Sequence, residues 1–140
     1  MPKLVIDTDL LSEILKGINP NVIRAQQAYC EEHEVLSFAS VTAFEILFGY
    51  GHKNATAQME RAEALFAQND EITPTPEDYR LAAKIGSTLS RQGKTIGFID
   101  PVIAACAIRR GYGVASGNTA HFEFIRQAGF SFHLENWRDA

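Results

Sequence analysis

The sequence has few cysteines and no long apolar run, and both absences narrow the class of protein. Its two cysteines, Cys30 and Cys106, lie in helical patterns without the close Cys and His spacing of a zinc site, so we expect buried thiols in a reducing compartment rather than a disulfide. No apolar run approaches the roughly 18 residues of a membrane span, and the one after Met1 is too short for a signal peptide. We therefore expect a cytoplasmic protein.

The chain also lacks positive net charge, internal repeats and low-complexity segments. Its net charge of −4 provides no overall attraction to a polyanion, so a nucleic-acid ligand would need basic residues that cluster locally. A hydrophobic fraction of 46% with 21% charged residues is ordinary for a globular protein, and 140 residues suit one domain. We predict a single domain over residues 1–140.

Short strand patterns alternate with helical patterns along the chain. The strand patterns cover residues 4–6, 35–38, 71–73, 112–116 and 131–134, and the helical patterns cover 8–16, 20–31, 40–50, 54–68, 76–91, 102–110 and 119–126. Ser40 and Thr75 are placed to act as N-caps, and Gly17 and Gly111 to end helices. The alternation predicts an α/β fold, with a central, mostly parallel sheet of four to five strands and helices on both faces.

Polar residues from distant segments fall at one edge of this predicted sheet. Asp7 follows the first strand, Glu45 lies in the helix after the second, and Asp100 opens the helix that leads into the fourth. Asn118 and His121 follow the fourth strand. Functional groups of such sheets collect where the strands' carboxyl ends meet the next helices, and clustered carboxylates are typical of a site for a hard cation.

Each of the three acids also has a structural interpretation. The helix of Glu45 is apolar nearly all round over residues 41–48, which predicts that Glu45 is buried and paired with a metal, an arginine or the backbone. Asp100 precedes a proline, as ordinary N-caps do. Asp7 could make a turn at the strand end. The three acids together favour a site more than any one of them does.

Three further residues near this edge each have more than one interpretation. Asp9 lies in the first turn of its helix, where the dipole favours a carboxylate, or it supports the site. His121 is a ligand, a phosphate contact or a surface residue. Asn118 is a turn residue or N-cap, although its neutral oxygen also suits the water network around Mg²⁺.

Four segments, in the right order along the chain, resemble the motifs of PIN-domain ribonucleases, especially the VapC-type toxins. They are Val5–Ser12, Ser40–Gly49, Ile96–Ala105 and Ala115–Phe122, and the closing Leu134–Trp137 resembles the terminal strand and tryptophan of that family. The resemblance covers essentially the whole chain. It implies a PIN-like three-layer fold and a metal-dependent endoribonuclease in which Asp7, Glu45 and Asp100 form the acidic triad.

The resemblance carries further implications for cofactor and partners. It implies Mg²⁺ or Mn²⁺, an RNA substrate, products with a 5′-phosphate and a 3′-OH, a homodimer, and a VapB-like antitoxin whose tail covers the acidic groove. Thr8, Ser12 and Thr42 lie in the matched motifs, where we expect them to support the site or contact the substrate. Two departures from the family are Asp9, where asparagine is usual, and Asn118 with His121, where many members have an acid. We expect one metal site to be weaker or filled differently.

The predicted mechanism is hydrolysis assisted by a metal. Asp7 and Asp100 would bind the metal directly and Glu45 directly or through water, with Asn118 completing the catalytic set. The metal would neutralise a phosphodiester oxygen and lower the pKa of a bound water for in-line attack, without a covalent intermediate.

Basic residues near the predicted site would contact the phosphates of the substrate. Arg91, Lys94 and Lys84 precede the Asp100 helix, and Arg109 and Arg110 lie at its far end. Arg91 also sits at a helix C-terminus, where a cation is favourable without any ligand.

Two other functions fit part of the sequence. Asp7-Thr8-Asp9 resembles the D-x-D of haloacid-dehalogenase-like phosphatases, but Leu11 stands where that family has Thr or Val, and its late Gly-Asp-x-x-x-Asp is absent. A PIN fold that only binds RNA or antitoxin would explain the missing fourth acid, and the three retained acids speak against it. Dependence of cleavage on a metal, and release of phosphate from a monoester, separate the three alternatives.

Overall fold

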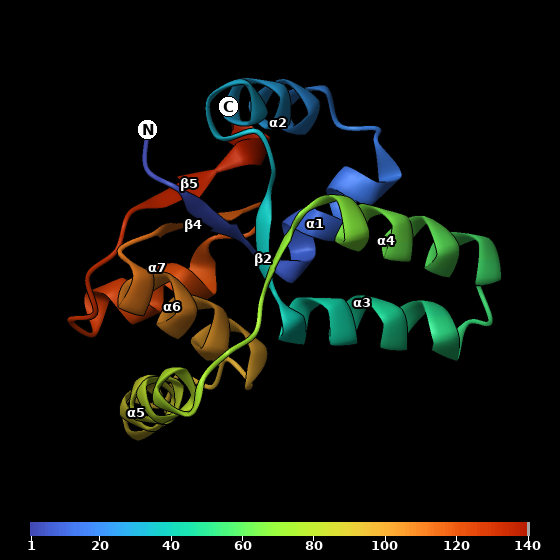
Figure 1. The fold of residues 1–140 in the computed structure, drawn as a ribbon. Coiled ribbons are helices and arrows are strands. Elements are labelled where there is room, and N and C mark those ends of the chain that lie inside the picture. The colour runs from blue at the N-terminus through green and yellow to red at the C-terminus, as the bar shows by residue number, and fades with distance from the viewer. Residues whose placement is uncertain (140) are drawn as a thin grey trace.

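Five short parallel strands run through the middle of the fold, with helices on both sides of them (Figure 1). The computed structural model describes residues 1–139. In chain order the elements are β1 (Leu4–Ile6), α1 (Thr8–Lys16), α2 (Pro20–His33), β2 (Ser37–Ala39), α3 (Ser40–His52), α4 (Thr56–Gln68), β3 (Asp70–Ile72), α5 (Pro76–Arg91), α6 (Ile99–Arg110), β4 (Gly113–Ser116), α7 (Ala120–Gln127), β5 (Leu134–Asn136) and the 3₁₀ turn η1 (Trp137–Asp139). The strand order is β3-β2-β1-β4-β5, and every neighbouring pair is parallel. The predicted α/β class and parallel sheet are confirmed.

The central strand β1 is apolar on both faces because helices cover both. Leu4, Val5 and Ile6 are all fully buried. Val5 belongs to the core formed with α5, α6 and α7, whereas Leu4 and Ile6 belong to the core formed with α1, α2 and α4. This division follows from the alternation of side chains along a strand, and a parallel sheet covered on both faces reads as a continuous apolar run.

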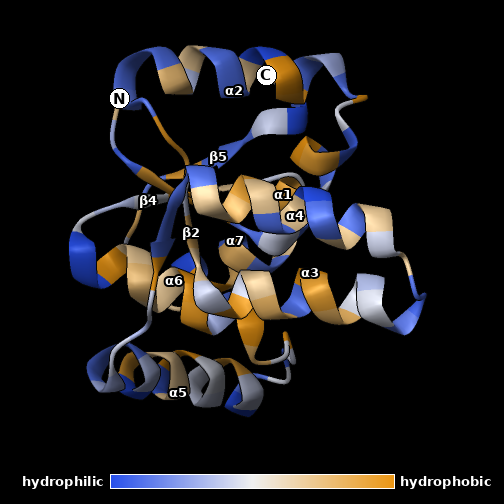
Figure 2. Cartoon of the chain, turned by 45° about the vertical axis from the view of Figure 1, so that its right-hand side comes forward, coloured by the Kyte–Doolittle hydropathy of each residue, from blue (hydrophilic) through white to orange (hydrophobic). Residues whose placement is uncertain are grey.

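Helix α6 packs between the sheet and α5. It is buried from Pro101 to Ala107, and Figure 2 shows its hydrophobic colouring beside the more hydrophilic α5. Leu89 of α5 and Ile103 of α6 belong to the same core cluster. The buried position of α6 fixes its first turn, which carries Asp100, at the carboxyl edge of the sheet.

The structure tests the predicted helix ends. Gly17 ends α1 in the left-handed region at φ 65°, and Thr75 forms a capping box with Asp78, as predicted. The N-cap role predicted for Ser40 is wrong, because α3 begins at Ser40 itself and the hydroxyl donates to Oε2 of Glu71 at 2.8 Å. An acceptor on the neighbouring strand β3 takes the hydroxyl away from the helix backbone.

The last strand lies further along the chain than predicted. Residues 131–134 alternate like a strand, but β5 begins at Leu134, which pairs with Val114. Phe132 precedes the ladder and packs edge-on against Phe122 in the core, 6.4 Å between ring centroids. The apolar residue that suggested a strand is therefore a core contact made from a loop.

Both cysteines are free thiols, as expected from the sequence. Cys106 is buried, and Cys30 is partly buried. Among residues 1–139, no helix combines the length and the hydropathy that crossing a bilayer requires.

Candidate functional site

Asp7 lies at the point where β1 ends beside β4. Its backbone N–H donates to the carbonyl of Ala115 at 3.0 Å, and its side chain is almost completely buried. The hydroxyl of Ser116 donates to Oδ2 of Asp7 at 2.6 Å, and the N–H of Leu10 donates to Oδ1 at 2.8 Å. Asp7 is therefore the N-cap of α1 as well as a candidate site residue, so the structural interpretation and the functional one describe the same geometry.

Burial is the main influence on the protonation of Asp7. It raises the pKa of Asp7 to about 7, although the hydrogen bonds from Ser116 and Leu10 act in the opposite direction. The nearby carboxylates of Asp100 and Asp9 raise this pKa further. A buried acid next to other acids favours either a proton or a cation, which is typical of a functional site.

Asp100 lies in the first turn of α6 and contacts a histidine from α7. Nδ1 of His121 is 2.8 Å from Oδ2 of Asp100. Burial raises the pKa of Asp100, the hydrogen bond and charge of His121 lower it, and Asp9 raises it. The N-cap interpretation of Asp100 is wrong, because α6 begins at Ile99 and its N-cap residue is Phe98. The Asp100 carboxylate is thus directed to the site rather than to the helix backbone.

Glu45 is exposed, and the prediction that it is buried is wrong. Helix α3 buries Thr42, Ala43 and Ile46, but leaves Phe44 65% exposed. The apolar residues all round this helix predicted burial, whereas part of that apolar surface has no cover within the described chain. Glu45 instead lines a cavity of about 210 Å³.

That cavity lies between α1 and α3. Thr8 and Ser12 of α1 line it together with Glu45 of α3, and two cations, Lys16 and Lys53, complete its charged lining. Sequence reasoning missed both lysines, because nothing local to either of them indicates that α1 and α3 face each other here. Two positive charges in a cavity beside an acidic site would suit the phosphate backbone of a nucleic acid.

The start of α1 is tied to α3. The hydroxyl of Thr8 donates to that of Thr42 at 3.1 Å, and Thr42 is fully buried. This bond fixes the residue next to Asp7 against the helix that carries Glu45. Both threonines came from the matched motifs, and the structure brings them together.

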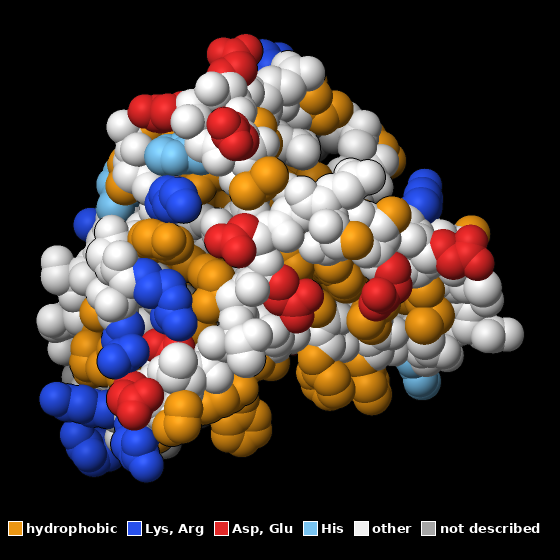
Figure 3. All heavy atoms as spheres, viewed as in Figure 1, with side chains coloured by type: hydrophobic (Ala, Val, Ile, Leu, Met, Phe, Trp, Pro, Cys, Tyr) orange, Lys and Arg blue, Asp and Glu red, His pale blue; other side chains and the backbone are white. Residues whose placement is uncertain are grey.

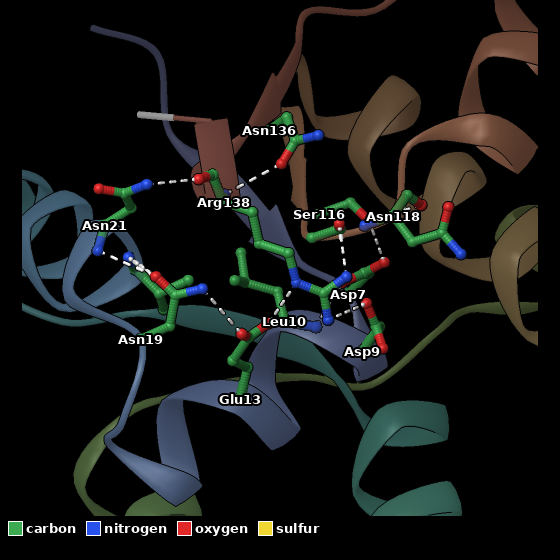
Figure 4. Close-up of polar contacts among 12 residues, drawn as sticks. Asp7, Asp9, Leu10, Glu13, Asn19, Asn21, Ser116, Asn118, Asn136 and Arg138 are labelled. Carbon is green, nitrogen blue, oxygen red and sulfur yellow. Dashed lines mark hydrogen bonds and ion pairs between the residues drawn. The ribbon is translucent and has the colours of Figure 1, made fainter.

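Asn118 acts through its backbone. Its N–H donates to Oγ of Ser116 at 2.9 Å, and its carbonyl oxygen lies 2.9 Å from the same Oγ. In Figure 4 its side-chain amide extends away from Asp7. The turn interpretation of Asn118 thus describes its backbone, which holds the serine that hydrogen-bonds to Asp7.

The two arginines at the far end of α6 bind a buried acid of α5. Arg110 donates to both oxygens of Asp78, at 3.1 and 3.0 Å, and Nη1 of Arg109 lies 3.4 Å from Oδ1. Burial of Asp78 opposes ionisation and is the largest single influence, but the hydrogen bonds from Arg110 and Thr75 and the charge of Arg110 together outweigh it, so the pKa of Asp78 is lowered. These arginines are engaged in an ion pair between two helices, which speaks against their predicted contact with substrate phosphates.

The other predicted cations lie before α6. Nζ of Lys94 is 4.8 Å from the ring centroid of Phe124, a cation–π contact, and Arg91 is exposed in the last turn of α5. Lys84 is exposed on the same helix. Figure 3 shows basic side chains gathered over α5. This part of the surface is therefore locally positive, although the net charge of the chain is negative.

Arg138 is a residue of the site that sequence reasoning missed. Nη2 lies 3.2 Å from Oδ2 of Asp9, Nε donates to Oε2 of Glu13 at 2.6 Å, and Nη1 donates to the carbonyl of Gly117 at 2.9 Å (Figure 4). No local signal in the sequence Trp137-Arg138 could have indicated these contacts, because they join the 3₁₀ turn η1 to α1 and to the loop after β4.

The chemistry of the donors suits a divalent cation, although the side chains are not gathered around one point. Asp7, Asp9 and Asp100 interact electrostatically, and their oxygens are the ligands that Mg²⁺ and Mn²⁺ prefer. Within residues 1–139, no three Asp, Glu, His or Cys side chains are grouped closely enough to hold a metal ion. Asp9 is held by Arg138, and Glu45 lines the cavity between α1 and α3.

The fold and the site define an α/β protein with a carboxylate centre at the carboxyl edge of a five-stranded parallel sheet. Residues 4–126 match the PIN domain, so the chain belongs to the PIN-domain family. The predicted resemblance to VapC-type members of that family is confirmed. The chain is 32% identical to the VapC ribonuclease Y4jK of Sinorhizobium fredii (strain NBRC 101917 / NGR234), over 86% of this chain and 90% of that protein.

Solved structures share the fold at lower identity. The DNA-bound VapBC structure from Salmonella typhimurium matches with a TM-score of 0.81 at 20% identity, over 98% of this chain and 99% of that one. VapBC2 from Rickettsia felis, bound to a promoter DNA fragment, matches with a TM-score of 0.80 at 16% identity, over 96% of this chain and 98% of that one. At these identities the similarity concerns the fold.

Proposed function

We propose that this chain is a metal-dependent endoribonuclease, the toxin of a VapBC-type toxin-antitoxin pair. The observation that carries the proposal is the juxtaposition of Asp7 and Asp100, two acids from distant segments whose pKa values are both raised, at the carboxyl edge of a PIN-domain sheet. The relative from Sinorhizobium fredii is named a VapC ribonuclease, which supports this activity over a phosphatase or a protein that only binds RNA.

Asp7 and Asp100 would hold the metal, and Glu45 would act directly or through water. Mg²⁺ takes few protein carboxylates and keeps several waters, so two acids with a more distant third are sufficient. When bound, the ion would neutralise charge on a phosphodiester oxygen and lower the pKa of a coordinated water.

The neighbouring residues orient the two acids. Ser116 and the N–H of Leu10 fix both oxygens of Asp7, while His121 fixes one oxygen of Asp100. Asn118 fixes Ser116 in turn. Carboxylates held by such partners keep their geometry when a phosphodiester enters, which is how a site of this type gains its catalytic effect.

The substrate would be RNA, with phosphates held by local cations. Lys16 and Lys53 line the cavity next to Glu45, and Lys94 and Arg91 lie before α6. By resemblance, cleavage would leave a 5′-phosphate and a 3′-OH.

The partners in this proposal are a VapB-like antitoxin and a second copy of the chain. Similar structures are of VapBC complexes, two of them with DNA, and this supports an assembly of the same type for this chain. An acidic groove would accept a basic antitoxin tail, since arginine pairs well with carboxylates. We place such a toxin in the cytoplasm.

The test is cleavage of a mixed cellular RNA pool by protein verified free of antitoxin. Reactions contain Mg²⁺, Mn²⁺ or EDTA, and compare the natural protein with Asp7→Asn and with Asp70→Asn, a matched change at an exposed position of β3. We expect discrete fragments that require metal, persist in Asp70→Asn and fall at least about 100-fold in Asp7→Asn.

Three outcomes would overturn the proposal. Cleavage that persists in EDTA would exclude metal dependence. RNA binding without cleavage in either metal would favour a PIN fold kept for binding alone. Release of phosphate from a monoester, without RNA fragments, would favour the phosphatase.

A further inference from the structure

Arg138 is held at the acidic site by an elaborate set of contacts. Its guanidinium reaches Asp9, Glu13 and the carbonyl of Gly117 through three different nitrogens. Its main chain is fixed as well, since its N–H donates to Asn136 at 3.0 Å and its carbonyl accepts from Asn21 at 2.7 Å. Hydrogen bonds thus hold both the guanidinium and the main chain of Arg138.

The acceptor side of these contacts is also organised. Nδ2 of Asn19 donates to the second oxygen of Glu13 at 3.2 Å, so that Glu13 faces the guanidinium with its other oxygen. Figure 4 shows Asp9, Glu13 and Arg138 converging beside Asp7. Asp7 is also close enough to raise the pKa of Arg138, although the hydrogen bond to Glu13 is the larger cause.

Gly117 leaves the space that the guanidinium occupies. A Cβ at this position would lie 2.9 Å from Nε and 3.1 Å from Cζ of Arg138, and 3.3 Å from Oδ2 of Asp9. Any other residue at 117 would therefore displace the end of Arg138 from Asp9. The guanidinium of Arg138 can occupy this position only because residue 117 is a glycine.

We propose that Arg138 is the internal cation of the carboxylate site and competes with the divalent metal for Asp9. The proposal rests on the metal site proposed above. With the guanidinium in place, Asp9 is engaged and a positive charge stands beside Asp7, so metal binding is weakened. When Arg138 leaves, Asp9 is free to join Asp7 and Asp100. The 3₁₀ turn η1 thereby sets the metal affinity of a site built on β1 and α6.

The probe is Mn²⁺, titrated by calorimetry into the full chain, without RNA. We expect Arg138→Gln to lower the Kd for Mn²⁺ by about three- to tenfold, because a unit charge a few ångströms from the site is removed and a carboxylate is released. Gly117→Ala should lower the Kd in the same direction while the total charge stays unchanged. Arg61→Gln, at an exposed position of α4, is the matched control and should leave the Kd unchanged.

A double-mutant cycle identifies Asp9 as the shared partner. In an Asp9→Asn background, the gain from Arg138→Gln should shrink to less than about twofold, because no Asp9 carboxylate remains to be released and only the loss of the charge beside Asp7 is left. A gain of the same size with and without Asp9 would overturn competition for that residue. Circular dichroism on each variant checks that the fold is kept, and Gly117→Ala tests the idea with the Arg138 backbone anchors intact.

The inference and the proposed function fail in different ways. If the natural protein binds Mn²⁺, loses that binding in Asp7→Asn, and shows the same or weaker binding in Arg138→Gln, the competition by Arg138 is wrong and the metal site stands. If Asp7→Asn binds Mn²⁺ as well as the natural protein does, the metal site itself is wrong, and the inference is overturned with it.

Discussion

At the scale of single residues, the site is defined by acids in positions that disfavour their charge. Burial raises the pKa of both Asp7 and Asp100, and the neighbouring Asp9 raises each of them further. Their hydrogen-bond donors, Ser116 and His121, hold the carboxylates in place. A site of this kind gains stability when a cation or a proton arrives, so its stability and its function are linked.

Asp7 should make stability depend on pH in a direction opposite to that of a paired acid. Because its pKa is about 7 in the folded chain and 3.8 without the fold, the folded state holds the extra proton between these values, and stability falls as pH rises from about 4 to 7. In EDTA, Asp7→Asn should stabilise the protein at pH 8 by roughly 1–3 kcal/mol and flatten that slope.

Urea denaturation at pH 5 and pH 8 measures both effects. Asparagine is as good an N-cap as aspartate, so the bond from the Leu10 N–H is retained in the variant. Asp70→Asn on β3 serves as the matched control and should keep the slope of the natural protein. A variant at position 7 that is less stable than the natural protein at pH 8 would contradict the argument.

The local sequence indicated where some residues of the candidate site lie, but not others. The position of Asp7 could be predicted, because an acid directly after a buried first strand lies at the carboxyl edge of the sheet in an α/β fold. The contacts of Arg138 with Asp9 and Glu13 could not be predicted. They depend on where the last strand, β5, places the 3₁₀ turn that follows it. The prediction that Glu45 is buried was wrong, because the pattern of apolar residues along a helix does not show whether the same chain covers the apolar surface.

At the scale of elements, the pair α5 and α6 is held together by a buried ion pair. Asp78 closes the capping box of α5 with Thr75 and receives two hydrogen bonds from Arg110 of α6. The side chain of Asp78 has no exposed surface. One carboxylate thus serves as helix cap and interhelical contact, and Asp100 lies at the other end of the same α6.

Asp78→Asn should be strongly destabilising. The change removes the charge that compensates Arg110 and weakens the capping box, and we expect a loss of about 2–4 kcal/mol in the free energy of unfolding. Thermal and urea unfolding of Asp78→Asn, beside Glu77→Gln at an exposed position of the same first turn, separate this loss from a general effect of charge on the helix. A loss below about 1 kcal/mol would show that solvent replaces the ion pair.

Elements with strong end signals were predicted well. Helix α1 spans Thr8–Lys16 as predicted, because Asp7 precedes it and Gly17 follows it. The predicted end of α2 fell short of His33, and β2 was placed too early, because no glycine or proline marks that junction. The strand order could not be predicted, since the parallel register of β1 against β4 is set by packing between distant segments.

At the scale of the whole molecule, apolar surface lies outside both cores. Phe44 and Phe48 of α3 are 65% and 67% exposed, and Phe98, just before α6, is 89% exposed. Figure 3 shows hydrophobic side chains protruding below α3 and beside α5. A cavity of about 620 Å³ lined mainly by apolar groups lies between α5 and the segment before α6. Apolar patches of this kind mark sites of association between proteins.

We expect this face to mediate the proposed homodimer. Replacing Phe44 and Phe48 together with serine should shift the molar mass measured by light scattering from dimer to monomer, because aromatic residues contribute most of the energy of such interfaces. Exposed side chains contribute little to the fold, so the monomer should unfold within about 0.5 kcal/mol of the natural chain. Val35→Ser, at an exposed apolar position before β2, should leave the mass unchanged. A double variant that keeps the mass of the natural protein would place the self-association on another face, and the two rings would then be available to the antitoxin.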